Sequence, residues 1–127
     1  MIQIITDKYE DTVAIKMSGK LSQEDYQVVV PLLENKIELY GKINIYCEVI
    51  EVSSMKPGAI WEDLKFDAKH FKNFNRVAIV GERGWLDWLS TFAKPFTTAE
   101  IKYYSNNEKA KAMDWVVRGK EEYEAQH

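Results

Sequence analysis

The sequence has one cysteine, little net charge and no long apolar run, and each shortage excludes a class of protein. Because Cys47 is the only cysteine in 127 residues, no intramolecular disulfide and no cysteine-based zinc site can form. Seventeen Lys and Arg against twenty Asp and Glu give a net charge of −3, which removes the electrostatic case for nucleic acid. The longest uncharged run, residues 26–33, falls well short of the roughly 18 residues that a membrane span needs. Residues 1–7 lack the basic start and cleavage site of a signal peptide, so we expect a cytoplasmic protein.

What is present is an ordinary globular mixture with many aromatic residues. A length of 127 residues predicts one domain, which we place at residues 1–120, followed by a polar tail at 121–127. Hydrophobic residues make up 46% of the chain and charged residues 29%, which is not the composition of a disordered chain. Four Trp, seven Tyr and five Phe make up 13% of the chain. These large residues either fill the core or, in part, line a pocket or an interface.

Three strands are expected in the first half of the chain. Apolar runs at residues 2–5 and 12–18, separated by a short polar turn, are typical of an antiparallel pair, and Gly19 is expected to break the second. Residues 43–50 are almost continuously apolar, which predicts a strand covered on both faces. A loop is expected to follow at residues 51–58.

The clearest helix lies between the second and third of these strands. Ser22 is a good N-cap, Asp25 is an imperfect capping-box partner, and Gly41 is placed to end the helix. Pro31 lies inside and predicts a kink. The expected buried stripe, at helical spacing, consists of Tyr26, Val29, Val30, Leu33, Ile37 and Tyr40.

The second half of the chain alternates between helices and strands. We expect strands at 77–80 and 99–105 and helices at 59–74 and 84–93. A final helix, with Ser105 or Asn106 as its N-cap, is expected to run to about Gly119. The expected inner stripes of the three helices are, in order, Trp61, Leu64, Ala68 and Phe71; Trp85, Trp88, Leu89 and Phe92; and Ala110, Met113 and Val117. The order β-β-α-β-α-β-α-β-α predicts an α/β fold with a mixed, mostly parallel sheet whose antiparallel first strand lies at the edge.

Several segments resemble the SpoIIAA-like family of small bacterial proteins. They are residues 61–67 (WEDLKFD), residues 75–81 (NRVAIVG), Trp88, the Pro95-Phe96 pair and residues 108–115. The resemblance covers nearly the whole chain, and its motifs are packing motifs. It implies a STAS-type fold, a βα superhelix with a mixed sheet. It also implies kinship with sporulation anti-sigma factor antagonists and, more loosely, with lipid-binding domains of the Sec14 type.

The chain departs from this family at the phosphorylation site. Anti-sigma factor antagonists carry a phosphorylatable serine in an Asp-Ser-Ser/Thr-Gly motif, where the charge of the phosphate switches partner binding. The corresponding stretch here is Met55-Lys56-Pro57-Gly58, which keeps the glycine and lacks the acid and the hydroxyl. Ser53 and Ser54 lie upstream as an offset acceptor or as ordinary loop hydroxyls. We therefore predict that this loop is not a regulatory phosphosite.

Two further patterns are weak candidates for binding sites. Gly81-Glu82-Arg83-Gly84 precedes a predicted helix, whose N-terminus and Arg83 could hold an anion, but we favour an ordinary strand-to-helix turn. Asp63, Asp67 and His70 share one helical face and could meet a metal. That face lies away from the buried stripe and no remote histidine completes a site, so we expect no metal.

No arrangement of residues indicates catalysis. Cys47 alternates with apolar neighbours in a middle strand, which favours a buried, inert thiol. Order and spacing suggest no Ser-His-Asp or Cys-His arrangement. We therefore expect a non-enzymatic protein without a cofactor, and a small enzyme with an unrecognised site remains an alternative.

The aromatic helices at 59–74 and 84–93 supply the leading functional hypothesis. Both follow central strands, so their first turns are expected at the sheet edge where α/β proteins bind ligands. Gly81 and Gly84 bracket the start of the later helix as hinges. We predict a pocket for an apolar or lipid-like small molecule, lined by Trp61, Leu64, Trp85, Trp88, Leu89 and Phe92. The alternative is that all six fill the core.

Two apolar residues lie off these stripes and predict an interface. Phe66 lies almost opposite the buried stripe of its helix, and Leu86 points away from that of the next. We expect them to form a homodimer interface or a peripheral membrane contact. The rival hypothesis for the whole protein is a protein-interaction module of the anti-sigma-factor-antagonist type that works without the phosphorylatable serine.

Overall fold

A single five-stranded sheet organises the chain, and its spatial order follows the order of the sequence. The computed structural model describes residues 1–6, 9–20, 22–54, 72–82 and 98–118. The strands are β1 (Ile2–Thr6), β2 (Thr12–Lys20), β3 (Ile43–Ser54), β4 (Phe74–Gly81) and β5 (Glu100–Tyr104). The first strand pairs antiparallel with β2, and β2 to β5 are parallel. The predicted mixed sheet with an antiparallel edge strand is therefore confirmed.

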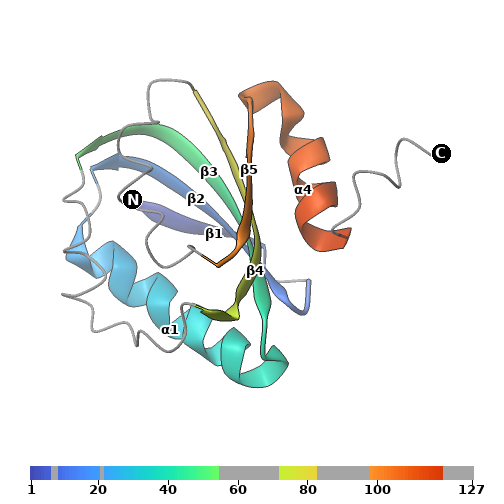
Figure 1. Cartoon of the computed structure of the whole chain (residues 1–127). Coiled ribbons are helices and arrows are strands. Elements are labelled where there is room, and N and C mark those ends of the chain that lie inside the picture. The colour runs from blue at the N-terminus through green and yellow to red at the C-terminus, as the bar shows by residue number, and fades with distance from the viewer. Residues whose placement is uncertain (7–8, 21, 55–71, 83–97, 119–127) are drawn as a thin grey trace.

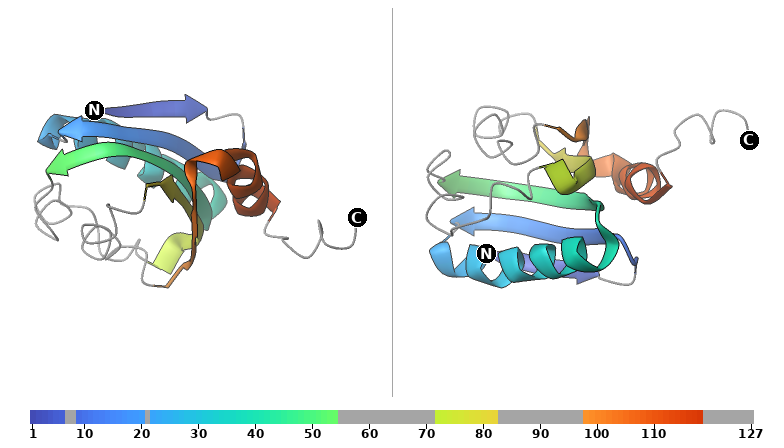
Figure 2. Two further views of the ribbon diagram at one scale, coloured as in Figure 1. Left: turned by 90° about the horizontal axis from the view of Figure 1, so that it is seen from above. Right: turned by 60° about the horizontal axis from the view of Figure 1, so that its bottom comes forward.

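Two helices cover opposite faces of this sheet (Figures 1 and 2). Helix α1 (Gln23–Tyr40) follows β2, while α4 (Lys109–Arg118) follows β5 after the 3-10 turn η4 (Asn106–Glu108). Helix α1 contacts β1 and β3 and shares a core with side chains of β2 and β4, whereas α4 contacts β3, β4 and β5. The expected helices at 59–74 and 84–93 lie outside the described residues, except for 72–74.

The alternation of side chains along each strand builds a separate core on each face. In β3, Ile45 and Cys47 point toward α1, whereas Tyr46 points toward α4, which confirms a strand covered on both faces. The α1 side is the larger core and consists of Val13, Ile15, Met17, Tyr26, Val29, Val30, Leu33, Ile37, Ile43, Ile45, Cys47, Val49, Phe74, Val77 and Ile79. The α4 side consists of Ala14, Tyr46, Ala78, Val80, Tyr104, Ala112, Trp115 and Val116.

Helix α1 begins and ends where its capping residues predict. Ser22 and Asp25 form a reciprocal capping box, and the Gly41 N–H donates to the Ile37 carbonyl oxygen at 2.7 Å. Gly41 has a φ of +81°, a conformation that glycine adopts without the strain of a Cβ. Pro31 is exposed inside the helix and does not interrupt it.

Several expected boundaries and one expected core residue were wrong. The second strand continues through Gly19, which has a φ of +64° beside a register shift, so the residue bends the strand without ending it. The third strand runs on to Ser54, beyond the expected start of the loop. Phe74 begins β4 instead of ending a helix, because it pairs with Ile43. Tyr40 is exposed because it ends α1, where its ring lies 5.6 Å from the Lys36 ammonium.

The final helix turns a different face to the sheet from the one predicted. Ala110 is exposed and Met113 and Val117 are half-buried, whereas the buried residues are Ala112, Trp115 and Val116. This short helix has two adjacent apolar stripes, the predicted one and the one with Trp115, and periodicity alone does not show which of them is buried. The size of the Trp115 ring decides between them, because the sheet offers it a floor that includes the small residues Ala14 and Ala78.

Candidate functional site

The residues that the sequence predicts as a site lie outside the described part of the chain. This holds for the six pocket residues, for the interface residues Phe66 and Leu86, for the loop 55–58 and for the acids and histidine of the rejected metal site. Their roles stay predictions. Among the described residues, the candidate site is a cavity between α1 and the sheet.

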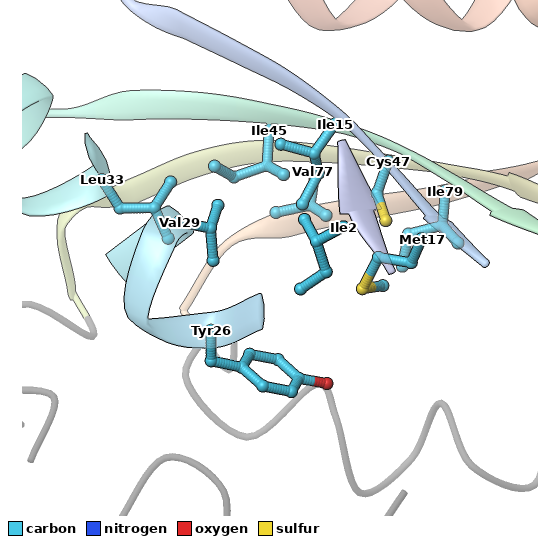
Figure 3. A pocket seen from close by; sticks show the side chains of 10 residues that line it. All are labelled: Ile2, Ile15, Met17, Tyr26, Val29, Leu33, Ile45, Cys47, Val77 and Ile79. Carbon is cyan, nitrogen blue, oxygen red and sulfur yellow. The ribbon is translucent and has the colours of Figure 1, made fainter. Parts of the chain in front are cut away.

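The cavity is small and entirely apolar (Figure 3). Its volume is about 20 Å³, which is room for about one water-sized molecule, and only apolar atoms contribute to its surface. Figure 3 shows the strand side chains above and Tyr26 of α1 below, with Ile2 of β1 between them. The lining residues are Ile2, Ile15, Met17, Tyr26, Val29, Leu33, Ile45, Cys47, Val77 and Ile79.

Strand register and helical spacing bring these residues together. Ile15, Cys47 and Ile79 are cross-strand neighbours in one row across β2, β3 and β4, so their side chains leave the sheet side by side. Tyr26 and Val29 lie three residues apart on α1 and face that row. Most lining residues belong to the core that the sequence predicts, but no sequence signal marks the void between them, since its size depends on sub-ångström packing.

The two groups of the cavity that could ionise are held neutral. Burial raises the pKa of the Cys47 thiol far above its ordinary value, so the thiolate, which is the nucleophile, does not form at neutral pH. Burial likewise raises the pKa of the Tyr26 phenol. The cavity therefore offers apolar contact and no acid–base or nucleophilic chemistry.

One carboxylate lies at the rim of the cavity. Asp25 Oδ2 accepts a hydrogen bond from the Ser22 N–H at 2.8 Å, and Asp25 Oδ1 accepts one from the Ile2 N–H at 3.3 Å. The Met1 ammonium lies 3.6 Å from the same side chain. The backbone hydrogen bond from Ser22 is the largest of several contacts that lower the pKa of Asp25. The sequence predicts the role of Asp25 in the helix cap but not its second contact, the hydrogen bond that it accepts from Ile2 of β1.

A second polar group lies on the α4 side of the sheet. The Tyr46 hydroxyl donates to the Glu48 carboxylate at 2.8 Å, and Glu48 lies 3.4 Å from the Lys109 ammonium. Desolvation, followed by that hydrogen bond, raises the pKa of Tyr46. These contacts join β3 to the first residue of α4, so we interpret them as a support for that helix.

The other end of α4 is held by an arginine. Arg76 of β4 donates from Nε to the Val116 carbonyl oxygen at 3.1 Å and from Nη2 to that of Val117 at 3.4 Å. Its backbone N–H donates to Asn44 Oδ1 at 3.2 Å, and the buried Asn44 amide donates to Thr12. A polar row across three strands therefore ends in a cap on the C-terminus of α4.

A wider groove of about 300 Å³ lies beside α4, and it is mixed in character. Asp114 and Arg118 form an ion pair of 3.0 Å along one wall. The lining residues are Tyr9, Ala110, Met113, Asp114, Val117 and Arg118. The charged wall makes this groove a poorer match for a lipid-like molecule than the apolar cavity beneath α1.

The described residues form neither a metal-binding cluster nor a membrane-spanning helix. No group of three His, Cys, Asp or Glu side chains lies close enough to hold a metal ion within the described ranges. Neither α1 nor α4 is long and apolar enough to cross a membrane.

Comparison with known proteins gives the family of the chain. The family model described as SpoIIAA-like matches residues 12–117. A similar solved structure is that of an uncharacterised DUF3478-family protein with a SpoIIAA-like fold from Shewanella loihica PV-4, at 36% identity and a TM-score of 0.61. That match covers 91% of this chain and 92% of the other. The comparison with curated proteins finds no match. With its five-stranded sheet and a family match over residues 12–117, this chain belongs to the SpoIIAA-like family.

Proposed function

We propose that the protein is a non-enzymatic binding module for an apolar, lipid-like small molecule. The observation that carries the proposal is the cavity beneath α1, whose wall is wholly apolar. A ligand site is typically apolar with few polar anchors, and the neutral Cys47 and Tyr26 leave this one without catalytic groups. A SpoIIAA-like fold is consistent with a binding or regulatory module.

The volume of the cavity limits which part of a ligand it takes. At about 20 Å³, it accepts a terminal methyl group or the edge of a ring, and the remainder of the molecule needs further apolar surface. In this proposal the six predicted aromatic and aliphatic residues, from Trp61 to Phe92, supply that surface. Phe66 or Leu86 would then mediate contact with a second copy or with a membrane.

A matched pair of valine substitutions tests the proposal. Val29 lines the cavity, whereas the adjacent Val30 is buried in the same core and does not. Val29→Leu adds one methylene into the void, and Val30→Leu adds the same group elsewhere, at a similar packing cost of about 1–3 kcal/mol. Binding of a fatty acid, followed by tryptophan fluorescence, should saturate near one ligand per chain and weaken in Val29→Leu only.

Two results would contradict this function. One is the absence of saturable binding by any fatty acid or by the apolar dye ANS. The other is equal binding by the two valine variants, which places the dye or acid away from the cavity. The first result favours the rival, a protein-interaction module that regulates its partner without phosphorylation, and a pull-down from the native host then tests that rival. The second result moves the binding site out of the cavity and removes the observation on which the proposal rests.

A further inference from the structure

The cavity has one wall residue that is not buried. Nine of the ten lining residues are buried, and Ile2 is the half-buried exception. It lies in β1, the edge strand, which pairs with β2 alone. Its cross-strand neighbour Met17 also lines the cavity. The void therefore comes nearest to solvent where β1 meets the first turn of α1.

The other walls are much harder to move. Strands β2, β3 and β4 each have a hydrogen-bonded neighbour on both sides, and Val29 and Leu33 lie in the middle of α1. In contrast, β1 is five residues long and has a register shift between Ile4 and Thr6. Short edge strands with irregular pairing open at a lower free-energy cost than central strands.

The Asp25 side chain ties the start of β1 to α1, while Met1 exchanges hydrogen bonds of 2.6 and 2.9 Å with Ser18 of β2. Asp25 accepts the Ile2 N–H on one carboxylate oxygen and the Ser22 N–H and Oγ–H, at 2.8 and 3.0 Å, on the other. Tyr26, the next residue, forms the cavity wall that faces Ile2. The Asp25 side chain is 21% exposed, so the contact lies within reach of water.

We infer that the gap between Ile2 of β1 and Tyr26 of α1 is the entrance to the cavity, and that Asp25 is the positioning residue that holds it closed. Opening requires the Ile2–Asp25 hydrogen bond and the Met1–Ser18 hydrogen bonds to break, after which the start of β1 moves away from α1 and the void opens to solvent. The role of a ligand in this opening rests on the proposed function, whereas the entrance itself depends only on the fold.

Cys47 is a built-in reporter for the opening. It is the only cysteine of the chain, it lines the cavity and it is 2% exposed, so a thiol reagent such as dithiodipyridine reaches it only after an opening event. Asp25→Asn keeps the shape of the side chain and removes the charge that strengthens the Ile2 contact. We expect its Cys47 labelling rate to rise about tenfold, which corresponds to about 1.4 kcal/mol, because the amide oxygen of Asn accepts a weaker hydrogen bond than a carboxylate does.

Two controls separate this role from loss of helix stability. Glu24→Gln removes a charge from the same first turn without touching β1, and it should leave the labelling rate within about twofold of the wild type. Ser22→Ala removes the hydroxyl half of the cap and keeps the Asp25–Ile2 contact, so it should lower stability in urea more than it speeds labelling. If the labelling rate of Cys47 rises in proportion to the loss of global stability in all three variants, the inference is wrong.

A second pair keeps the inference testable if Asp25→Asn does not fold. Ile2 and Ile4 lie on the same face of β1, since they pair with Met17 and Ile15, and only Ile2 lines the cavity. Ile2→Ala should speed labelling of Cys47, whereas Ile4→Ala, at a site that is 44% exposed, should not. Equal rates in this pair place the entrance elsewhere and contradict the inference.

Adding a fatty acid distinguishes this inference from the proposed function. If Asp25→Asn and Ile2→Ala speed labelling but no fatty acid protects Cys47, the entrance stands and the ligand-binding function falls. If a fatty acid protects Cys47 and neither variant changes the rate, the function stands and the entrance is wrong.

Discussion

At the scale of single residues, the most consequential side chain is a carboxylate with two roles. Asp25 satisfies the N-terminus of α1 through Ser22 and also receives the N–H of Ile2 from the edge strand. The first role follows from sequence spacing, because Asp25 stands three residues after a serine N-cap. The second depends on how close β1 passes to α1, which no local pattern encodes.

The lowered pKa of Asp25 predicts how its contribution to stability depends on pH. Its pKa lies below the ordinary value of 3.8 because the folded state donates hydrogen bonds to the carboxylate. The carboxylate therefore stabilises the fold fully above 3.8, and this stabilisation is lost as pH falls through the folded pKa.

We expect Asp25→Asn to cost about 1 kcal/mol in urea unfolding at neutral pH. The difference in the free energy of unfolding between this variant and the wild type should stay constant down to about pH 5 and shrink below pH 3.8. Glu24→Gln provides the comparison for a charge lost from the same turn. A difference for Asp25→Asn that is unchanged at about pH 3 would show that the charge contributes nothing.

At the scale of elements, the two helices differ in how they are held. Helix α1 has 18 residues and buries a stripe of five large apolar side chains, which are Tyr26, Val29, Val30, Leu33 and Ile37. Helix α4 has 10 residues and buries three, which are Ala112, Trp115 and Val116. We therefore expect polar contacts at its two ends to contribute a larger share of the stability of α4 than of α1.

The arginine cap on α4 gives a prediction at this scale. Arg76→Met keeps a long apolar stem and leaves the Val116 and Val117 carbonyl groups without the guanidinium donor. We expect the variant to lose about 1–3 kcal/mol of stability, mainly in α4. Cations stabilise helix C-termini, and a partly buried carbonyl group that loses its donor destabilises the fold.

Hydrogen exchange measures where that loss falls. The amides of α4 should exchange faster in Arg76→Met while those of α1 keep their wild-type protection. Lys72→Met, at an exposed position just before β4, is the control and should change neither helix. Uniform loss of protection across both helices would argue against a local cap.

The elements also show where sequence reasoning succeeds and where it stops. The mostly parallel sheet, its antiparallel edge strand and most of the buried stripe of α1 were predictable, because hydrophobic period and helix capping agree there. Tyr40 and the inner face of α4 were not. Periodicity places Tyr40 on the buried stripe but cannot show that this last residue of the helix is exposed. Periodicity also cannot show whether Met113 or Trp115 faces the sheet, because that depends on the shape of the sheet surface beneath the helix.

At the scale of the whole molecule, the candidate site was only partly predictable. The sequence predicts an apolar binding module and places its pocket around Trp61 and Trp85, outside the described residues. The cavity of the described part lies instead within the predicted core, between Ile15, Val29 and their neighbours. A void and a filled core have the same sequence pattern, so only coordinates distinguish them.

Association is the property of the whole molecule that the sequence predicts most directly. Phe66 and Leu86 lie off the apolar stripes of their predicted helices, so we predict that each contacts an apolar partner outside the domain. The double variant Phe66→Ser/Leu86→Ser should leave the thermal midpoint within a few degrees of the wild type, as surface substitutions usually do. It should shift the protein toward monomer in analytical ultracentrifugation, or toward the free fraction in vesicle co-sedimentation.

A matched variant distinguishes an interface from general loss of surface hydrophobicity. Val28 and Leu39 of α1 are 60% and 65% exposed, and Val28→Ser/Leu39→Ser removes two apolar side chains from a face known to be open. This control should change neither the oligomeric mass nor vesicle binding. If the Phe66→Ser/Leu86→Ser variant unfolds, those residues belong to the core, because truncating a buried Phe or Leu costs several kcal/mol of stability. Equal behaviour of the two double variants would remove the interface, because both sites would then act only as exposed apolar surface.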